Sequence, residues 1–145
     1  MKGIRSAQSK LKNMQEHILV IGVTGTGKST LLTKTKIPDS KYFDFIDLCK
    51  NKCFQHYLCE ENGELFFDTL LASNEKTLIL DAVHFPVDLN SSTLVSFIKK
   101  ASEQDKRLIV VTFPSEAERI EWLFGAVISM SGRRNNDREC CVKIV

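Results

Sequence analysis

The chain has 145 residues, and its 20 Lys and Arg side chains nearly balance its 18 Asp and Glu side chains. This length favours a single domain, because one hydrophobic core commonly supports about 100–200 residues. Hydrophobic residues make up 43% of the chain and charged residues 26%, which is ordinary for a globular protein and argues against intrinsic disorder. Wholly apolar runs such as Leu108–Val111 fall far short of the roughly 20 residues that a membrane-spanning helix needs, so no membrane association is expected.

Residues 1–17 are predicted to form a basic arm in front of the main domain, residues 18–145. The apolar residues of the arm recur at helical spacing: Ile4, Ala7, Leu11 and Met14. This pattern predicts a short amphipathic or frayed helix on the surface. The arm lacks the continuous apolar stretch of a secretory signal. The five cysteines then indicate a reducing compartment, and we predict a cytoplasmic location.

Short apolar runs alternate with helical patterns along the rest of the chain. Four runs predict buried strands: Ile18–Ile21, Tyr42–Ile46, Thr77–Leu80 and Leu108–Phe113. Five segments are predicted to be helical. The first begins near Lys28 and ends before Pro38, and the next two are Cys49–Cys59 and Glu64–Ala72, with a break at Gly63 between them. A fourth lies around Leu94–Ala101 behind Asn90, Ser91 and Ser92, and a fifth runs from a Ser115–Glu118 capping box to Phe124. A terminal hairpin is predicted from Ala126–Met130 and Cys140–Val145. Alternating strands and helices indicate an α/β fold with a mostly parallel, five-stranded sheet covered on both faces, plus the C-terminal hairpin.

The segment from Gly22 to Ser29 reads Gly-Val-Thr-Gly-Thr-Gly-Lys-Ser and matches the pattern G-x-x-x-x-G-K-[ST]. It follows a predicted strand and opens a predicted helix. Glycines allow the backbone to turn with its N–H groups facing inward, where they bind phosphate oxygens, and the helix N-terminus adds its positive end. A chance match is expected in about one chain in two hundred of this length. The segment therefore predicts a phosphate-binding loop, and its glycine spacing excludes the dinucleotide pattern G-x-G-x-x-G.

This motif in this context resembles the P-loop NTPase superfamily, where it is called Walker A. The resemblance implies a three-layer α/β sandwich that binds a nucleotide and Mg²⁺. Lys28 would contact the β- and γ-phosphates in a catalytic role, and the Ser29 hydroxyl would bind the metal. The predicted nucleotide-binding residues are Gly22, Val23, Thr24, Gly25, Thr26, Gly27, Lys28, Ser29 and Thr30. No guanine-reading N/TKxD motif is present, so ATP is the expected nucleotide.

An acidic residue at the end of a later strand holds magnesium through water in this superfamily. Thr77-Leu-Ile-Leu-Asp81 has that form, so Asp81 is the predicted Walker B residue, with a catalytic role and a role at the metal. Many P-loop ATPases follow this Asp with a Glu that polarises the attacking water. Here the next residue is Ala82, which leaves His84 and Glu116 as the nearest candidates for that task.

Three functions remain open at this point. The first is a motor-type ATPase that resembles the FtsK/HerA/RecA-like group and acts on or with nucleic acid. Thr24 stands where small-molecule kinases often have Pro, the strand Leu108–Phe113 ends in a polar Thr112, and Ala126–Val145 resembles the closing strands of RecA-like cores. Motor-type ATPases build sites between subunits, so the resemblance also implies a homo-oligomer in which Arg133 or Arg134 acts in trans.

The second candidate is a nucleoside or polynucleotide kinase that transfers the γ-phosphate of ATP to a hydroxyl. Asp44 or Asp47 would be its base. Three arginines would neutralise the transferring phosphoryl group: Arg133, Arg134 and Arg138. The third candidate is a nucleotide-binding module without turnover. Strand order separates the first two, because the ATPase group inserts a strand between the Walker A and Walker B strands, whereas kinases pair those strands directly.

The cysteines do not form a convincing metal site in the sequence. One cluster holds four residues of ligand type: Cys49, Cys53, His56 and Cys59. On a single helix these side chains spread along one face and cannot enclose a tetrahedral zinc ion, so core thiols are the better interpretation. Cys140 and Cys141 are adjacent, and on a strand they would face opposite ways.

Overall fold

The computed structural model describes residues 2–23, 25–45, 63–81, 91–132 and 137–145. Several predictions therefore lie outside the described residues, namely the helix Cys49–Cys59 with its possible zinc ligands, and the roles of Thr24, Asp47, Ala82, His84, Arg133 and Arg134. The side chain of Glu116 is also outside the description.

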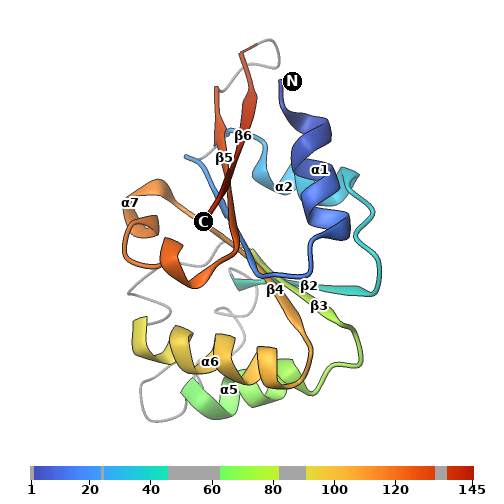
Figure 1. Cartoon of the computed structure of the whole chain (residues 1–145), viewed down its shortest axis with the longest axis vertical. Helices are drawn as coiled ribbons and strands as arrows, with labels where there is room; N and C mark the ends of the chain where they lie inside the picture. Colours follow the sequence, from blue (N-terminus) through green and yellow to red (C-terminus); the bar gives the residue numbers. More distant parts are fainter. Residues whose placement is uncertain (1, 24, 46–62, 82–90, 133–136) are drawn as a thin grey trace.

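Six strands form one sheet in the order β2-β3-β4-β1-β5-β6. The strands are β1 (Ile18–Ile21), β2 (Ser40–Asp44), β3 (Thr77–Asp81), β4 (Arg107–Thr112), β5 (Ala126–Ser131) and β6 (Glu139–Ile144). The first five are parallel, and β6 is antiparallel to β5, which confirms the predicted fold class (Figure 1). Strand β4 pairs with both β1 and β3, so it separates the strand before the phosphate loop from the strand that ends in Asp81.

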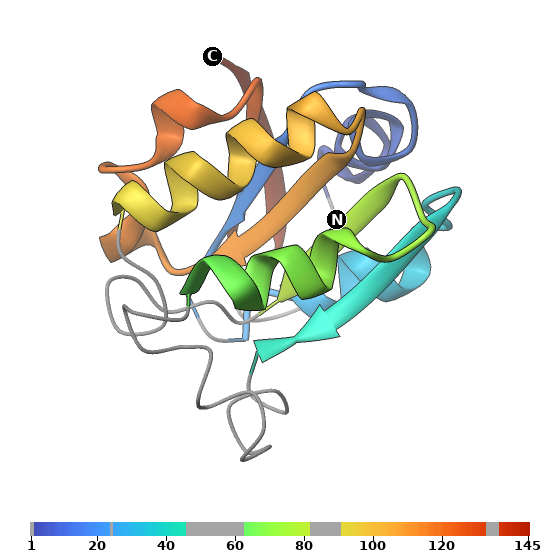
Figure 2. The same ribbon diagram turned by 90° about the horizontal axis from the view of Figure 1, so that it is seen from below.

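Helices cover both faces of this sheet and make three layers (Figure 2). On one face lie α1 (Ile4–Asn13) and α2 (Lys28–Lys34). The other face is covered by α5 (Gly63–Leu71), α6 (Ser91–Glu103), α7 (Pro114–Ala117) and the 3-10 helix η2 (Glu121–Leu123). Each face has its own cluster of buried apolar side chains, and Phe67 of α5 stacks on Phe97 of α6 with ring centroids 4.0 Å apart. Among the described residues, no helix combines the length and apolar character needed to cross a membrane.

One predicted helix start is wrong. The capping box at Ser115 is absent, because α7 begins at Pro114 behind Phe113, whose side chain makes no capping hydrogen bond. Proline fits the first position of a helix, where an N–H would be unpaired in any case. The side chains of Ala117, Ile120 and Phe124 are nonetheless buried, although turn and 3-10 backbone replace the continuous helix. Helix α5 begins at Gly63, one residue before its predicted start, and the predicted helix Cys49–Cys59 on the other side of the expected break lies outside the described residues.

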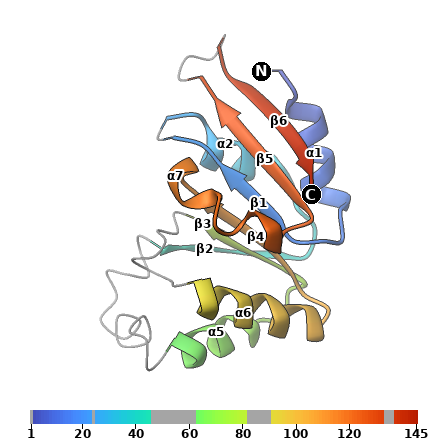
Figure 3. The same ribbon diagram turned by 60° about the vertical axis from the view of Figure 1, so that its left-hand side comes forward.

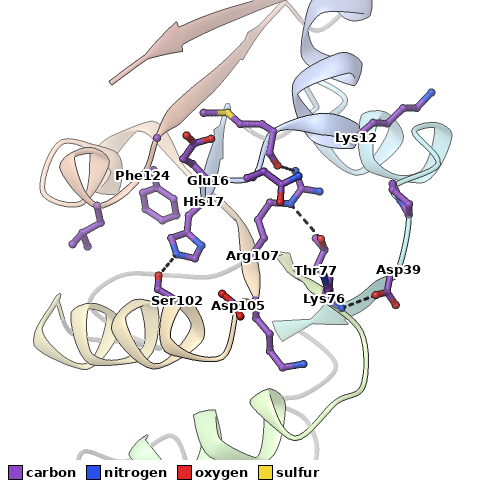
Figure 4. Close-up of a pocket in the computed structure, with 16 residues that line it drawn as sticks. Lys12, Glu16, His17, Asp39, Lys76, Thr77, Ser102, Asp105, Arg107 and Phe124 are labelled. Carbon is purple, nitrogen blue, oxygen red and sulfur yellow. Dashed lines mark hydrogen bonds between the residues drawn. The ribbon is translucent and has the colours of Figure 1, made fainter.

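The N-terminal helix α1 packs firmly against the sheet. Its Ala7 and Leu11 side chains are fully buried in the same cluster as β1 and α2. The guanidinium of Arg107, from the start of β4, lies beneath the last turn of α1 (Figure 4). It donates to the carbonyl oxygens of Leu11 at 2.5 Å and Met14 at 2.6 Å, and to Thr77 Oγ1 at 3.2 Å. A cation bonded to the free carbonyls of a helix C-terminus is favourable, and it anchors the predicted arm.

Replacing Arg107 by Ala should therefore destabilise the fold. The substitution leaves carbonyl groups of α1 without their charged donor, and hydrogen bonds to charged groups contribute about 1.5–3 kcal/mol each. We expect a loss of about 2–4 kcal/mol in the free energy of unfolding, measured by urea denaturation. Arg119→Ala is the matched control, because Arg119 is exposed and should change stability by less than about 0.5 kcal/mol. Equal stability of the two variants would contradict the anchoring role.

Candidate functional site

The carboxyl ends of β1, β3 and β4 meet at one edge of the sheet, where β1 leads toward α2 (Figure 3). A cavity of about 380 Å³ opens at this edge. It is lined by Gly25, Thr26, Gly27, Lys28, Ser29, Thr30, Asp81, Val111, Thr112, Phe113 and Arg138. Open α/β sheets bind ligands beyond the carboxyl ends of their strands. The structure thus brings most of the predicted loop residues together with Asp81.

The loop between β1 and α2 owes its shape to its glycines. Gly27 has φ of 90°, a left-handed conformation that side chains other than glycine's rarely adopt, and it immediately precedes α2. At Gly22 a Cβ atom would lie 2.5 Å from Thr26 Oγ1, so only glycine fits that close approach. The Thr26 hydroxyl donates to the carbonyl of Val23 at 2.8 Å. Because Thr26 is also fully buried, its side chain shapes the loop from within, while Val23 is exposed.

The ammonium of Lys28 folds back over its own loop. It donates a hydrogen bond to the carbonyl of Gly22 and lies 4.5 Å from the ring centroid of Phe113. Burial lowers the pKa of Lys28 below its usual value, and the Asp81 carboxylate offsets part of that shift. The lysine thus places a cation at the cavity, with an uncharged carbonyl and an aromatic ring as its partners.

Asp81 is buried at the end of β3, as the last residue of the strand. Its Oδ2 atom accepts a hydrogen bond from Ser29 Oγ at 3.0 Å. A hydroxyl and a carboxylate this close are the hard oxygen ligands that Mg²⁺ prefers, either directly or through its waters. The residues present therefore fit the expected metal. Among the described residues, no group of three or more His, Cys, Asp or Glu is arranged to hold a metal ion.

Tyr42 is a residue of the site that the sequence analysis missed. Its hydroxyl donates to the same Oδ2 atom of Asp81 from the neighbouring strand β2. Burial, and then the hydrogen bond to Asp81, raises the pKa of Tyr42. Asp44, the predicted kinase base, ends β2 directly beside Asp81 in the strand register. No local signal could reveal Tyr42, because its place depends on the pairing register of two separate strands.

Arg138 reaches the phosphate loop from the far end of the chain. It lies just before β6, and its Nη2 atom donates to the carbonyl of Gly25 at 3.1 Å. Of the three arginines considered in the sequence, it is the one within the described residues, and it lines the cavity. Cys140 and Cys141 follow it on β6, where Cys140 is buried and Cys141 exposed, which confirms that they face opposite ways.

A larger cavity of about 820 Å³ lies at the opposite edge of the sheet (Figure 4). Several of its polar groups are hydrogen-bonded within the protein. The Leu108 N–H donates to Nδ1 of His17, so the ring proton is on Nε2 and is donated to Ser102 Oγ at 2.8 Å. Burial and the charge of Arg107 both lower the pKa of His17, which favours this neutral form. The imidazole therefore does not activate the serine, and the smaller cavity is the better candidate site.

Comparison with known proteins supports the fold. No protein-family model matches the sequence, and no curated protein sequence is similar to it. Solved structures do match. A KaiC-like protein, PH0186 from Pyrococcus horikoshii OT3, has a TM-score of 0.56 at 19% identity over 94% of this chain and 82% of that protein. AMPPCP-bound DnaA from Aquifex aeolicus has a TM-score of 0.54 at 15% identity over 87% of this chain. Archaeal ribosome recycling factor aABCE1, in complex with the stalk protein aP1, has a TM-score of 0.56 at 14% identity.

These similarities define the class of fold. The chain has the P-loop NTPase fold, a mostly parallel sheet between helical layers with the loop after β1 at its carboxyl edge. It spans 44% of the DnaA chain and 34% of the aABCE1 chain.

The contact between Tyr42 and Asp81 generates a prediction for metal binding. The tyrosine hydroxyl donates to Asp81 Oδ2, the oxygen that the expected metal or its waters would use. Tyr42→Phe removes this competitor, and one hydrogen bond contributes about 1 kcal/mol, so the Kd of ATP in the presence of Mg²⁺ should fall about fivefold. Isothermal titration calorimetry would measure it.

Titration of Tyr42→Phe with ATP in EDTA is the internal control and should match the unsubstituted protein. A weaker Mg²⁺-dependent affinity would show instead that the hydroxyl supports the metal site.

Proposed function

We propose that the chain is a Mg²⁺-dependent ATPase of the motor, RecA-like type that acts on or with nucleic acid. One observation carries the proposal: Lys28, Ser29 and Asp81 converge on a single cavity at the carboxyl edge of the sheet, although 52 positions separate Ser29 from Asp81. A cation, a hydroxyl and a carboxylate on a glycine-rich loop and a neighbouring strand end suit a metal-bound triphosphate.

Each proposed site residue would make a different contact with the nucleotide or the metal. Backbone N–H groups from Gly22 to Thr30 would bind the phosphates, and Lys28 would leave the Gly22 carbonyl to contact the β- and γ-phosphates. Ser29 and Asp81 would hold Mg²⁺, which neutralises phosphate charge when bound. Arg138 extends a second cation toward the loop from the same chain. Its charge would favour the terminal phosphate, as arginines do in phosphoryl transfer.

Strand order supports the ATPase over the kinase alternative. In the superfamily that this chain resembles, kinases pair the Walker A and Walker B strands directly. In this chain β1 pairs with β4 and β5, and β3 pairs with β2 and β4. Strand β4 ends at Thr112, which is buried and lines the cavity, as expected for a strand that senses the nucleotide.

The partners belong to the proposal as well. A structure described as a DNA replication initiation factor matches with a TM-score of 0.53 at 17% identity, over 87% of this chain and 43% of that chain. This match supports the fold, and the action on nucleic acid is our extension of it. Assembly into a homo-oligomer would let a neighbouring copy complete the site, since motor-type ATPases share sites between subunits.

Nucleotide binding should fail in a residue-specific way. Lys28→Ala removes the cation that faces the phosphates, so we expect ATP affinity to fall at least about tenfold with or without metal. Asp81→Asn should weaken ATP binding in Mg²⁺ and leave binding in EDTA nearly unchanged, because Asp81 acts through the metal. Calorimetry with both variants tests this. Unchanged affinity in Lys28→Ala would refute the assignment of the loop.

Turnover should be slow without a partner. The position after Asp81 is Ala82, which cannot orient a water molecule as the usual glutamate does. Basal hydrolysis should lie well below the enzyme median of about 10 s⁻¹. In a phosphate-release assay we expect single- or double-stranded DNA or RNA to stimulate it.

A parallel assay with a panel of nucleosides follows phosphorylated product. Phosphorylated nucleoside in that assay would favour the kinase. An absence of turnover with every nucleic acid and every nucleoside would favour a binding module. Ala82→Glu should raise basal hydrolysis only in a site with ATPase geometry. Fast basal hydrolysis by the unsubstituted chain would contradict the argument from Ala82.

A further inference from the structure

Positive charge is concentrated at the start of the chain. Residues 1–38 contain seven Lys or Arg residues and a single acidic residue, Glu16, whereas residues 39–145 contain 13 basic and 17 acidic residues. The small net charge of the whole chain is therefore the sum of a basic N-terminal part and an acidic remainder. Helices α1 and α2 contain no Asp or Glu at all, and between them they hold five basic residues.

The fold gathers this charge on one side of the molecule. Helices α1 and α2 lie on the same face of the sheet, and their apolar residues belong to one buried cluster (Figure 2). Five basic side chains on or beside them are exposed, and we call them the basic face: Lys2, Arg5, Lys12, Lys34 and Lys36. On α1, Arg5 and Lys12 lie opposite the buried residues Ala7 and Leu11. The opposite layer is acidic or mixed, with Asp68 on α5 and Glu103 on α6.

The ion pairs seen among the described residues lie elsewhere. Lys100 pairs with Asp68 on the opposite layer, and Lys143 pairs with Glu121 of η2. The basic face thus gathers like charges on and beside two helices of one layer. Like charges repel one another and cost some stability, so such a cluster fits a ligand that carries many negative charges.

We propose that the basic face binds the phosphodiester backbone of a nucleic acid. Helix α1 is about 15 Å long, and nucleic acid strands carry one phosphate every 3.4 Å or so along a duplex, so several contacts can form at once. The proposal names where the partner of the proposed ATPase binds, and in that respect it rests on the proposed function. The binding itself needs no ATP, because the basic face excludes Lys28 and the rest of the cavity.

A membrane surface is a poorer fit for this face. A helix that lies in a membrane interface inserts its apolar side among the lipids. The apolar side of α1 packs inside the protein, where Ala7 and Leu11 are fully buried. The last turn of α1 is hydrogen-bonded to Arg107. Only the charges remain available, and these match a linear polyanion.

Fluorescence anisotropy with a labelled oligothymidylate of about 20 nucleotides tests the proposal in the absence of ATP. The test variant carries Arg5→Gln, Lys12→Gln, Lys34→Gln and Lys36→Gln. The control variant carries Lys41→Gln, Lys99→Gln, Arg119→Gln and Lys143→Gln, which removes the same charge from exposed positions outside the basic face. We expect the test variant to bind at least about tenfold more weakly than the control. The slope of log K against log salt should fall by about 2–3, since each lost strand contact contributes about 0.7.

Lysine acetylation in the folded, unsubstituted protein gives an independent measurement if a variant fails to fold. The oligonucleotide should protect Lys12 and Lys34 but leave Lys99 reactive. Equal weakening of both variants, protection of Lys99 instead, or binding only to anionic lipid vesicles would overturn the proposal. Lys28→Ala should bind the oligonucleotide as the unsubstituted protein does. If the chain binds the oligonucleotide but does not hydrolyse ATP, the proposed function alone is refuted. If it hydrolyses ATP but the basic face does not bind the oligonucleotide, the proposal for the basic face alone is refuted.

Discussion

The site depends on one constraint, the parallel alignment of β1, β4 and β3. Parallel strands end at the same edge, so the loop after β1 and the carboxylate at the end of β3 open toward the same space. Because β4 lies between them, Ser29 and Asp81 must meet across a strand, and the 3.0 Å hydrogen bond shows that they do. The start of α2 positions that serine, and Gly27 gives the backbone the turn that the helix start requires. The meeting of Ser29, Asp81 and the loop after β1 at one cavity is thus a consequence of strand order and strand direction.

Local patterns in the sequence predicted the parts that local chemistry determines. Strand β1 has the predicted bounds, and β3 and β4 differ from prediction by a single residue at their ends. Each is a continuous apolar run, which indicates a strand buried on both faces. The edge strand β2 begins at Ser40, two residues before its predicted start, because an edge strand tolerates polar residues such as Lys41. The glycine-rich loop after β1 could be recognised because its glycines and its lysine lie within eight consecutive positions.

Features that depend on distant pairing could not be read in this way. The roles of Tyr42 and Arg138 follow from the register of β2 on β3 and from the hairpin that returns the chain to the loop. Spacing alone showed that α1 is amphipathic, but it could not show which surface covers the apolar side or that Arg107 bonds to its last turn. The false capping box at Ser115 has a related cause. Its spacing was right, but Pro114 already fixed the start of the helix one residue earlier.

Arg138 connects the two regions for which we propose functions. Its guanidinium bonds to Gly25 in the phosphate loop, while its backbone carbonyl accepts from the N–H of Lys2 at 3.4 Å. The next contact is firmer, because the Cys140 N–H donates to the carbonyl of Lys2 at 2.8 Å. The start of the basic arm therefore pairs with the start of β6, and Gly3 fits there only without a side chain, since a Cβ would lie 2.0 Å from the Cys140 carbonyl oxygen. One arginine is held at both ends, by the loop that would receive phosphate and by the arm that begins the basic face. A nucleotide that draws the guanidinium away from Gly25 would act on a residue whose backbone is fixed to that arm.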